Sequence, residues 1–494
     1  MAGDVAQSEV AAAPPAGIEG LLSERDALGL AALVKAGEVS PAELLEAAIA
    51  RTEALDPQFN FMAQRHYDRA RAVIARGLPD GPLAGVPWLL KDLNTYIEGE
   101  LTENGSRLYR GNRAAQTSEL VHRVERAGMV IFGKTTTPEF GLTGTTESAL
   151  CGATRNPWSP GHIAGGSSGG AAAAVAAGVL PAAHATDGGG SIRIPASCCG
   201  LFGLKPSRGR VPMGPARTEG WGGLSVHHAV THSVRDSAAI LDATHGIEPG
   251  SRYGAPAPAE GFLAQVGREP GRLRIALMTT PPSGSPVDPE CVAATRAAAR
   301  LCESLGHIVE EAAPAVDAAV YGQASYVLIA ASVAADVEQR ASVIGKVAGP
   351  DVLETMTLAF VEHGRRVSGM DFARANAAVQ EIAVTVARFM ADYDVILSPT
   401  VGMLPLEIGV MGLTPPGDFE TWGRLASTFA SFTGVYNGTG QPSMSVPLGM
   451  SESGLPIGVM FNARYAEEAL LFRLAAQLEG AAPWAGRRAP VRAG

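Results

Sequence analysis

The stretch TDGGGSIR, residues 186–193, places Ser191 directly behind three consecutive glycines. Glycine has no Cβ, so successive backbone N–H groups can curl around an oxyanion. Acyl transfer needs such donors, because negative charge develops on the carbonyl oxygen in the tetrahedral state. We therefore expect the N–H groups of Gly188, Gly189, Gly190 and Ser191 to form an oxyanion hole, with Ser191 as a candidate nucleophile. An ordinary glycine-rich turn is the alternative interpretation.

A second glycine-rich stretch, GGSSGG at residues 165–170, carries Ser167 and Ser168. Its spacing fits G-x-S-x-G, the nucleophile elbow of α/β-hydrolases, with Ser167 at the centre. It also fits an anion site at a helix N-terminus, although the lysine of a phosphate-binding loop is missing. The preceding residues NPWSPGHIA do not resemble a strand, which weakens the elbow interpretation. A simple glycine-rich helix cap remains the alternative.

Lys91 ends the apolar run VPWLL and is the third candidate. A buried lysine without an anionic partner loses its charge, because desolvation lowers its pKa. A neutral amine can act as a general base. The alternative is a lysine that reaches water or pairs with Asp92. Ser–Lys variants of the catalytic triad exist, and a second serine can relay the proton when the amine cannot reach the nucleophile.

The elements that must position these residues alternate between helix and strand, which indicates an α/β fold. Helices are predicted over 26–56 (two, the second starting at Ser40), 118–127, 233–246, 288–306 and 466–479. Within 165–180, a glycine-rich turn is predicted to open an alanine-rich helix. Strands are predicted over 86–94, 129–133, 273–278, 394–401, 443–450 and 455–461.

One large domain accounts for this pattern best. Residues 1–20 are expected to form a flexible tail, and residues 21–494 the catalytic domain. The Pro/Gly-rich stretch 248–262 is the one plausible internal boundary, and we favour a surface loop there.

Composition narrows the functional class further. The net charge is −10 and no block of Lys and Arg stands out, which argues against a nucleic-acid or anionic-membrane partner. Five cysteines without metal-ligand spacing favour a reducing compartment. The longest apolar run, residues 171–180, is much shorter than the ~20 residues of a membrane span. The N-terminus does not resemble a signal peptide. A soluble, cytoplasmic protein is expected.

Taken together, the motifs resemble the amidase signature family. The resemblance lies in residues 165–211, in AGVPWLLKDLN (84–94), GKTTTPEF (133–140) and GATRNPW (152–158), and downstream in SPT (398–400), GQPSMSVPLG (440–449) and LPIGV (455–459). It covers most of the chain. It implies a single domain with a large, mixed, twisted β-sheet covered by helices on both faces, and neither cofactor nor metal.

The resemblance also implies a role for each residue of the site. Ser191 would be the nucleophile, Ser167, next to a cis peptide, the proton relay, and Lys91 the base. Ser168 would support the site by hydrogen bonding. Asp187 and Arg193, which flank the loop with opposite charges, are expected to pair and hold it in shape.

Within the family, several stretches look most like nylon-oligomer (cyclic-dimer) hydrolases. Arg193 is followed by Ile194 and Pro195 where the amidotransferase subunit usually carries a glutamine, which weakens that alternative. We expect a hydrolase of neutral, fairly hydrophobic amides, aryl or aliphatic, with carbamates also possible. Apolar residues expected near the pocket are Phe140, Leu142 and Ile192. Residues 212–232 and 411–420 are expected to shape it.

Three rival hypotheses stay open. An α/β-hydrolase esterase would use Ser167 with a distant acid and histidine. A metalloamidohydrolase would use His228 and His232, whose spacing of four can bind zinc on a helix, although the glutamate of HExxH is missing. A scaffold that only binds an amide would leave the serines and the lysine unused. The sequence leaves homodimer formation open.

Overall fold

A mixed β-sheet of eight strands forms the centre of the molecule. The computed structural model describes residues 17–415 and 417–490. The strand order is β12-β11-β13-β15-β14-β9-β10-β8. Strand β11 pairs in parallel with β12 and β13, and the other neighbours are antiparallel. The strands are β8 Ala182–Asp187, β9 Phe202–Lys205, β10 Val226–Thr231, β11 Arg274–Leu277, β12 Ile308–Glu311, β13 Val395–Pro399, β14 Ser443–Met450 and β15 Pro456–Ala463.

A second, three-stranded sheet continues the first beyond β8. Its strands are β1 Met62–Arg65, β3 Val130–Thr135 and β2 Pro87–Lys91, in that order. Strand β2 lies beside β8, and the backbone N–H of Lys91 donates to Nδ1 of His184 at 3.1 Å. A side chain therefore bridges the two sheets at this point. Two short hairpins complete the strands: β4 Glu147–Ser148 with β5 Gly152–Ala153, and β6 Arg155–Asn156 with β7 Ser159–Ile163.

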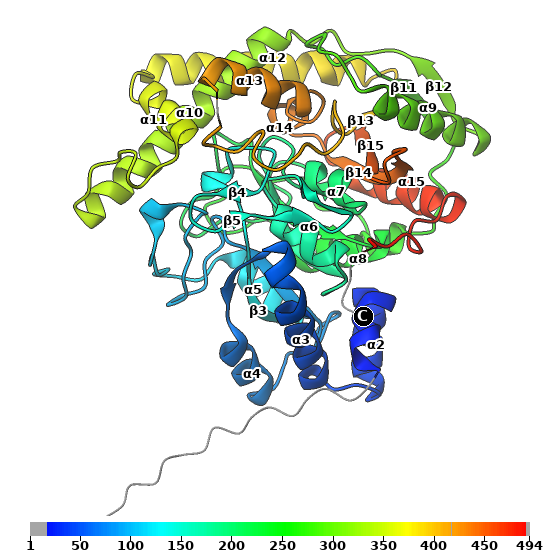
Figure 1. The fold of residues 1–494 in the computed structure, drawn as a ribbon. Coiled ribbons are helices and arrows are strands. Elements are labelled where there is room, and N and C mark those ends of the chain that lie inside the picture. Colours follow the sequence, from blue (N-terminus) through cyan, green and yellow to red (C-terminus); the bar gives the residue numbers. More distant parts are fainter. Residues whose placement is uncertain (1–16, 416, 491–494) are drawn as a thin grey trace, which may run out of the picture.

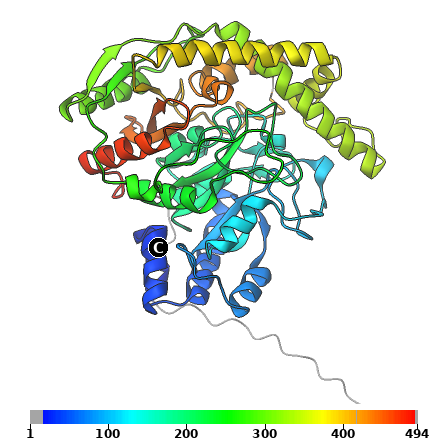
Figure 2. The ribbon, with the colours of Figure 1, turned by 180° about the vertical axis from the view of Figure 1, so that it is seen from behind.

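Helices cover both faces of the large sheet, as predicted. Helices α6 Gly169–Ala176 and α7 Arg193–Cys199 lie in front of it in Figure 1, and α8 Val234–Thr244 and α15 Glu468–Ala481 are seen from behind in Figure 2. Side chains alternate between the faces along each strand. A Cβ on Gly458 of β15 would lie 2.7 Å from Ser197 of α7, whereas His228 of β10 reaches Ser237 of α8 at 2.8 Å.

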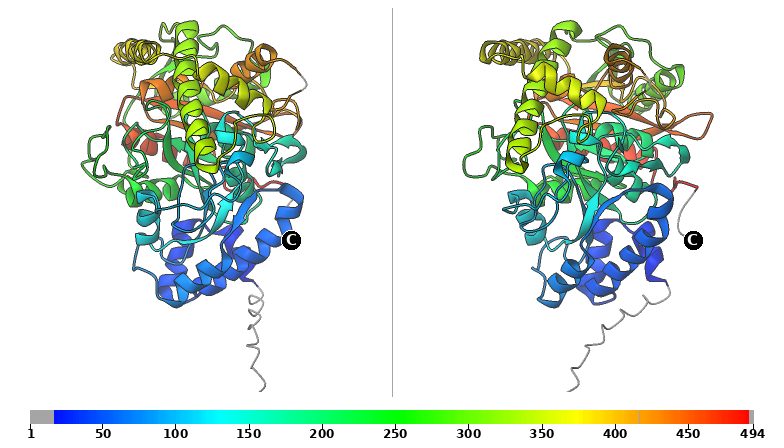
Figure 3. Two further views of the ribbon diagram at one scale, coloured as in Figure 1. Left: turned by 90° about the vertical axis from the view of Figure 1, so that its left-hand side faces the viewer. Right: turned by 60° about the vertical axis from the view of Figure 1, so that its left-hand side comes forward.

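The remaining helices gather at two ends of the molecule (Figure 3). At one end lie α1 Ile18–Glu24, α2 Ala27–Ala36, α3 Pro41–Phe59, α4 Tyr67–Ala75 and α5 Glu119–Arg126. At the other lie α10 Ala318–Ile344, α11 Thr355–Gly364, α12 Gly369–Phe389, α13 Phe419–Phe429 and α14 Val435–Thr439. Helix α9 Pro289–Ser304 follows β11, and 3₁₀ turns occupy Arg107–Tyr109, Glu139–Gly141 and Leu263–Gln265.

Helix α10 needs separate mention. In the part of the chain that the structure describes, it is the single helix long and apolar enough to cross a membrane by length and composition. It packs against α11 and α12, and several of its apolar side chains are buried.

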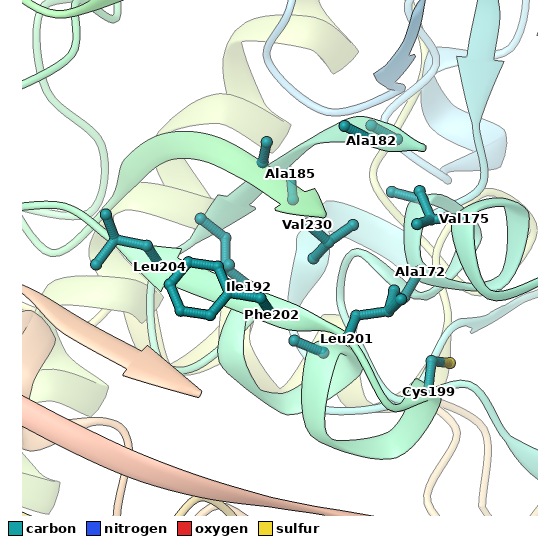
Figure 4. Close-up of a cluster of buried hydrophobic side chains, with 14 of the residues drawn as sticks. Ala172, Val175, Ala182, Ala185, Ile192, Cys199, Leu201, Phe202, Leu204 and Val230 are labelled. Carbon is teal, nitrogen blue, oxygen red and sulfur yellow. The ribbon is translucent and has the colours of Figure 1, made fainter. Parts of the chain in front are cut away.

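Small side chains let α6 approach the sheet closely. All eight residues of α6 are buried, and six of them are alanines or a valine. Figure 4 shows Ala172 and Val175 of this helix in one buried cluster with Ala182 and Ala185 of β8 and Val230 of β10. The close approach brings the start of α6 next to the end of β8, where the site lies.

Three sequence-based predictions can be compared with the structure here. Helix α6 begins at Gly169, after the glycine-rich turn that was predicted to open it. Helix α1 begins at Ile18, inside the predicted tail, whereas residues 1–16 of that tail lie outside the described residues. The stretch 248–262 lies between β10 and β11 of one sheet, as expected for the favoured loop and not for a domain boundary.

Candidate active site

The Lys91 side chain lies at the end of β2 and is fully buried. Its Nζ lies 2.7 Å from Ser167 Oγ, 2.9 Å from Ser168 Oγ and 2.8 Å from Thr186 Oγ1. Three hydroxyls therefore surround the amine. The sequence predicted the two serine contacts, and Thr186 was missed.

Burial favours the neutral form of this amine. It lowers the pKa of Lys91 well below the ordinary value, and the negative charge of Asp187 offsets this only in part. The alternative pairing with Asp92 does not occur, because Asp92 lies 3.5 Å from Nζ of Lys134. Burial thus favours the neutral form of Lys91, which can accept a proton.

The hydrogen-bond directions single out the hydroxyls that can give a proton to the amine. A neutral Lys91 amine has two hydrogens and one lone pair. The Ser168 hydroxyl donates to the Thr186 carbonyl oxygen at 3.2 Å, so it accepts from Lys91. The lone pair is left for Ser167 or Thr186, and Ser167 is the closer of the two.

Ser167 lies in the loop before α6, and the peptide bond from Gly166 to Ser167 is cis. Ser167 and Ser191 line the same cavity. Among the described residues, their hydroxyls do not bond to each other directly, so the structure closes only the first link of the predicted relay. Catalytic hydrogen bonds are often long before substrate binds. Gly141 packs against this serine: a Cβ there would lie 3.1 Å from Ser167 Oγ.

The loop after β8 wraps around the carboxylate of Asp187. Oδ1 accepts the Gly190 N–H at 2.7 Å, and Oδ2 accepts the Ile192 N–H at 3.1 Å. Gly190 therefore directs its N–H to Asp187, which removes it from the expected oxyanion hole. In the structure as described, the N–H groups of Gly188, Gly189 and Ser191 have no such partner, and they form the candidate hole.

Asp187 is held in turn by Arg193, as predicted. The guanidinium donates from Nε and Nη2 to the two carboxylate oxygens, each at 2.9 Å. Burial alone would raise the pKa of Asp187, but the charge and hydrogen bonds of Arg193 hold it below its ordinary value. Arg193 Nη1 also donates to the Thr433 carbonyl at 2.9 Å, and Nη2 to Oδ1 of Asn437 at 2.6 Å. The loop is thus fixed from α14 and from Thr433, which precedes this helix.

A cavity lies above these residues. Its apolar lining comes from Leu93, Phe140, Met213, Trp221 and Val226; its polar lining includes Asn94, Tyr96, Thr186, Arg217, Ser225 and His227. Residues 212–232 contribute much of this wall, as predicted, whereas none of 411–420 lines it.

Of the three apolar residues expected near the pocket, Phe140 lines the cavity and two do not. Leu142 is absent from the cavity lining and packs against the apolar core. Ile192 is fully buried and points into the cluster of Figure 4, next to Phe202 and Leu204. Leu142 and Ile192 are thus chain neighbours of the lining residues Gly141 and Ser191, but their own side chains do not line the cavity.

Comparison with known proteins decides the family. The Amidase family profile matches residues 43–472. The chain belongs to the amidase signature family. It is 40% identical over 481 residues to the 6-aminohexanoate-cyclic-dimer hydrolase of Paenarthrobacter ureafaciens, covering 94% of this chain and 96% of that protein. This amidase is an amide C–N hydrolase, and a serine-based mechanism is typical of its family.

Solved structures agree with this assignment. A 6-aminohexanoate cyclic dimer hydrolase structure superposes on the amidase with a TM-score of 0.90 at 38% identity, covering 95% of this chain and 99% of that one. A bacterial aryl acylamidase of the amidase signature family gives a TM-score of 0.85 at 27% identity, covering 94% and 99%. The predicted fold class is therefore confirmed.

The histidines considered as zinc ligands have other partners in the amidase. Nε2 of His228 lies 2.8 Å from Ser237 Oγ, and Nε2 of His232 lies 3.0 Å from the Val175 carbonyl oxygen. His228 is on strand β10, where a spacing of four does not place two side chains together as it does on a helix. Within residues 17–415 and 417–490, no cluster of three or more His, Cys, Asp or Glu could hold a metal ion.

Sequence analysis missed four residues of the amidase site: Thr186, Asn437, Gly141 and His227. Thr186 is the first residue of the motif TDGGGSIR, so its position next to the glycine loop could have marked it as a site residue. Asn437 contacts Asp187 across 250 positions of sequence, and no local pattern marks it. Gly141, in the 3₁₀ turn Glu139–Gly141, and His227, on β10, are brought to the cavity by the tertiary fold.

Proposed function

We propose that this amidase cleaves neutral, fairly hydrophobic amides, aryl or aliphatic and linear or cyclic, and also carbamates, through an acyl-enzyme on Ser191. One observation carries the proposal. A fully buried amine, Lys91 Nζ, lies 2.7 Å from the hydroxyl of Ser167, which shares a cavity with Ser191 at the end of a loop of free N–H groups. In this proposal Lys91 is the base, Ser167 the proton relay and Ser191 the nucleophile.

Acylation follows from this order. Neutral Lys91 takes the proton of Ser167, and Ser167 takes that of Ser191 as the Ser191 oxygen attacks the carbonyl carbon. The negative oxygen of the tetrahedral intermediate accepts the N–H groups of Gly188, Gly189 and Ser191. Each such donor contributes about 2.7–4 kcal/mol to lowering the barrier. The C–N bond then breaks, and the relay returns one proton to the departing nitrogen.

Deacylation uses the same groups in the same order. A water molecule gives one proton to the relay and attacks the acyl carbon, and Ser191 recovers its proton as the ester bond breaks. With an amide the products are an acid and an amine. With a carbamate cleaved at C–N, the acyl part leaves as a carbonic acid monoester. Lys91 is neutral again at the end of each cycle, so the site keeps no net charge from the reaction.

The lining of the cavity supports a neutral substrate. Arg217 is the one lysine, arginine, aspartate or glutamate among the residues lining it. Its guanidinium is occupied by Asp336, with bonds of 2.9 and 2.7 Å from Nη1 and Nη2. An ionic group on the substrate would find no free partner of opposite charge there, and burying it unpaired is costly. The names of the similar proteins, a cyclic-dimer hydrolase and an aryl acylamidase, fit the proposed range.

The proposal extends to the surroundings of the enzyme. We propose that it acts in the cytoplasm on small molecules, without a nucleic acid, a membrane, a cofactor or a metal, as a monomer or a homodimer. The absence of a basic block in the sequence and the chemistry of the serine and lysine groups support this.

Covalent labelling tests the assignment of the nucleophile. A fluorophosphonate is expected to modify Ser191, as mapped by mass spectrometry, and Lys91→Ala is expected to abolish the labelling. Ser197→Ala is the matched control, because Ser197 is buried in α7 six residues further on and lies outside the cavity lining; it should keep the label. A label on Ser167 alone would support the esterase alternative. A panel of neutral and charged anilides and carbamates then tests the substrate class, which fails if only charged amides are hydrolysed.

A further inference from the structure

His227 lines the catalytic cavity, and the hydrolytic mechanism does not use it. It lies on β10 directly opposite Thr186 of β8. Paired residues of antiparallel strands share one face of the sheet, so His227 is on the side of Thr186, whose hydroxyl contacts Lys91. An imidazole is thus placed beside the reacting groups.

A chain of hydrogen bonds leads from the backbone of Lys91 to this imidazole. The Lys91 N–H donates to Nδ1 of His184 at 3.1 Å. Nε2 of His184 lies 2.9 Å from Nδ1 of His227, and the two rings are stacked with an interplanar angle of 16°. The two histidines therefore form a relay that begins at the backbone N–H of Lys91, which can only donate a hydrogen bond.

The first bond fixes the position of every proton in this relay. A backbone N–H can only donate, so Nδ1 of His184 must accept and carries no hydrogen. Its neutral ring then holds its hydrogen on Nε2 and donates it to Nδ1 of His227. His227 in turn must carry its own hydrogen on Nε2.

Both rings are neutral at physiological pH. Burial lowers the pKa of His184 well below its ordinary value, and the neighbouring His227 adds to this. Burial lowers the pKa of His227 to about 4. The geometry requires the same state of His184, because a protonated ring would turn an N–H toward the N–H of Lys91.

The free end of the relay opens to the cavity. Nε2 of His227 makes no hydrogen bond to any residue that the structure describes, although the side chain is only 3% exposed and lines the cavity. Because Nε2 faces the cavity and has no partner among the described residues, a substrate atom that enters the cavity can accept its hydrogen.

We propose that the Nε2–H of His227 is a fixed donor for a second acceptor oxygen of the substrate, distinct from the scissile carbonyl oxygen. The loop amides hold the scissile oxygen, and His227 lies one strand away from that loop. The inference rests on the proposed hydrolysis through Ser191 and specifies its substrate class. It selects amides that carry a second neutral carbonyl or ether oxygen, and it disfavours those with a hydroxyl or amine N–H that must donate there, because the relay prevents His227 from changing tautomer.

Matched substrates provide the test. A series of anilides with one ketone oxygen at successive positions of the acyl chain is compared with the isosteres in which CH₂ replaces C=O. The wild-type enzyme is expected to prefer one ketone over its isostere by about tenfold or more in kcat/KM. His227→Phe, which keeps a ring without a donor, should remove that preference by raising KM for the ketone. His227→Gln, which restores an N–H donor, should recover part of it.

The relay itself has a matched pair of variants. In His184→Gln the new side chain can accept from the Lys91 N–H and donate to His227. In His184→Phe it can do neither. The preference should therefore persist in His184→Gln and weaken in His184→Phe. A purely structural role of His227 would change kcat for both substrates equally and leave their ratio unaltered.

A spectroscopic measurement decides the question even where a variant does not fold. Nitrogen-15 chemical shifts of histidine in the unaltered enzyme distinguish an Nδ1–H from an Nε2–H ring. An Nδ1–H tautomer for His227, or an unchanged ketone preference in His227→Phe, overturns the inference. Failure to hydrolyse any anilide overturns the proposed function instead, and the tautomer measurement still stands by itself.

Discussion

Replacing Lys91 by methionine gives a direct measure of the charge on this buried amine. Lys91→Met keeps an unbranched apolar side chain of similar length and removes the ionisable group. In the unfolded chain the lysine titrates near its ordinary value of 10.5, whereas burial lowers its pKa in the folded protein. Between these two pKa values the unfolded state binds one proton more than the folded state.

The sign and size of the effect follow from this difference. Stability rises with pH wherever the unfolded state binds more protons, by about 1.4 kcal/mol per pH unit for one proton. The wild-type protein should therefore gain that much relative to Lys91→Met for each unit between the lowered pKa and 10.5. Other buried groups, such as Lys205, are present in both proteins and cancel. The hydrogen bonds that three hydroxyls lose shift the difference by a constant, about 0.5–1.5 kcal/mol each, and leave its slope.

The assay is urea unfolding of both proteins in one-unit steps from neutral pH to about pH 10. Lys35→Met, at an exposed site on α2, is the control for exchanging a lysine for a methionine. Hydrolysis should fall by about 10²–10⁴-fold in kcat/KM, since the general base is lost. If the stability difference between the wild type and Lys91→Met stays constant over this range, Lys91 is charged in the folded protein, and its role as base is refuted.

Four further outcomes are expected. The wild-type kcat/KM should fall with acidification only below the lowered pKa of Lys91; an inflection near 10.5 would contradict this. Asp187→Asn leaves Arg193 buried without its counter-charge and should cost about 3–5 kcal/mol in urea unfolding, so a loss below about 1 kcal/mol would argue against the pairing. Gly141→Ala should lower kcat about 10²-fold, because a Cβ at φ +71° would lie 3.1 Å from Ser167 Oγ; unchanged kcat would remove that contact from the account. Dialysis against a chelator should leave activity intact, whereas a loss restored by zinc would revive the metal alternative.

The sequence predicted those elements that carry a strong local signal. The helix start at Ser40 is one, and the capping box with Glu43 is present. Strands rich in Val, Ile and Leu, such as β13 and β15, were placed within two residues of their observed ends. In the site, the glycine-rich loops were recognisable because an oxyanion hole needs backbone N–H groups without side chains in the way. The lysine at the end of β2 was recognisable because a buried amine can act as a base.

Elements that depend on tertiary packing were missed. Strand β8 reads AAHATD, with one β-branched residue, and becomes a strand because α6 covers it and β10 pairs with it. The N–H of Gly190 was expected to bind the oxyanion, but it donates to the Asp187 carboxylate. This competition between two acceptors is visible only in the folded structure. Thr186 was next to the motif, yet its contact with Lys91 joins positions 95 residues apart.

The bonds from α14 and the preceding Thr433 to the loop after β8 have a consequence for protein synthesis. Asn437 donates to the Asp187 carboxylate at 2.9 Å, and Thr433 donates to the Gly189 carbonyl at 2.6 Å. The nucleophile loop thus leaves the ribosome more than two hundred residues before the groups that fix it. A nascent chain that already contains Lys91 and both serines should remain inactive until α14 has emerged. Catalysis then begins only when the chain is nearly complete, which keeps partly made protein from hydrolysing amides.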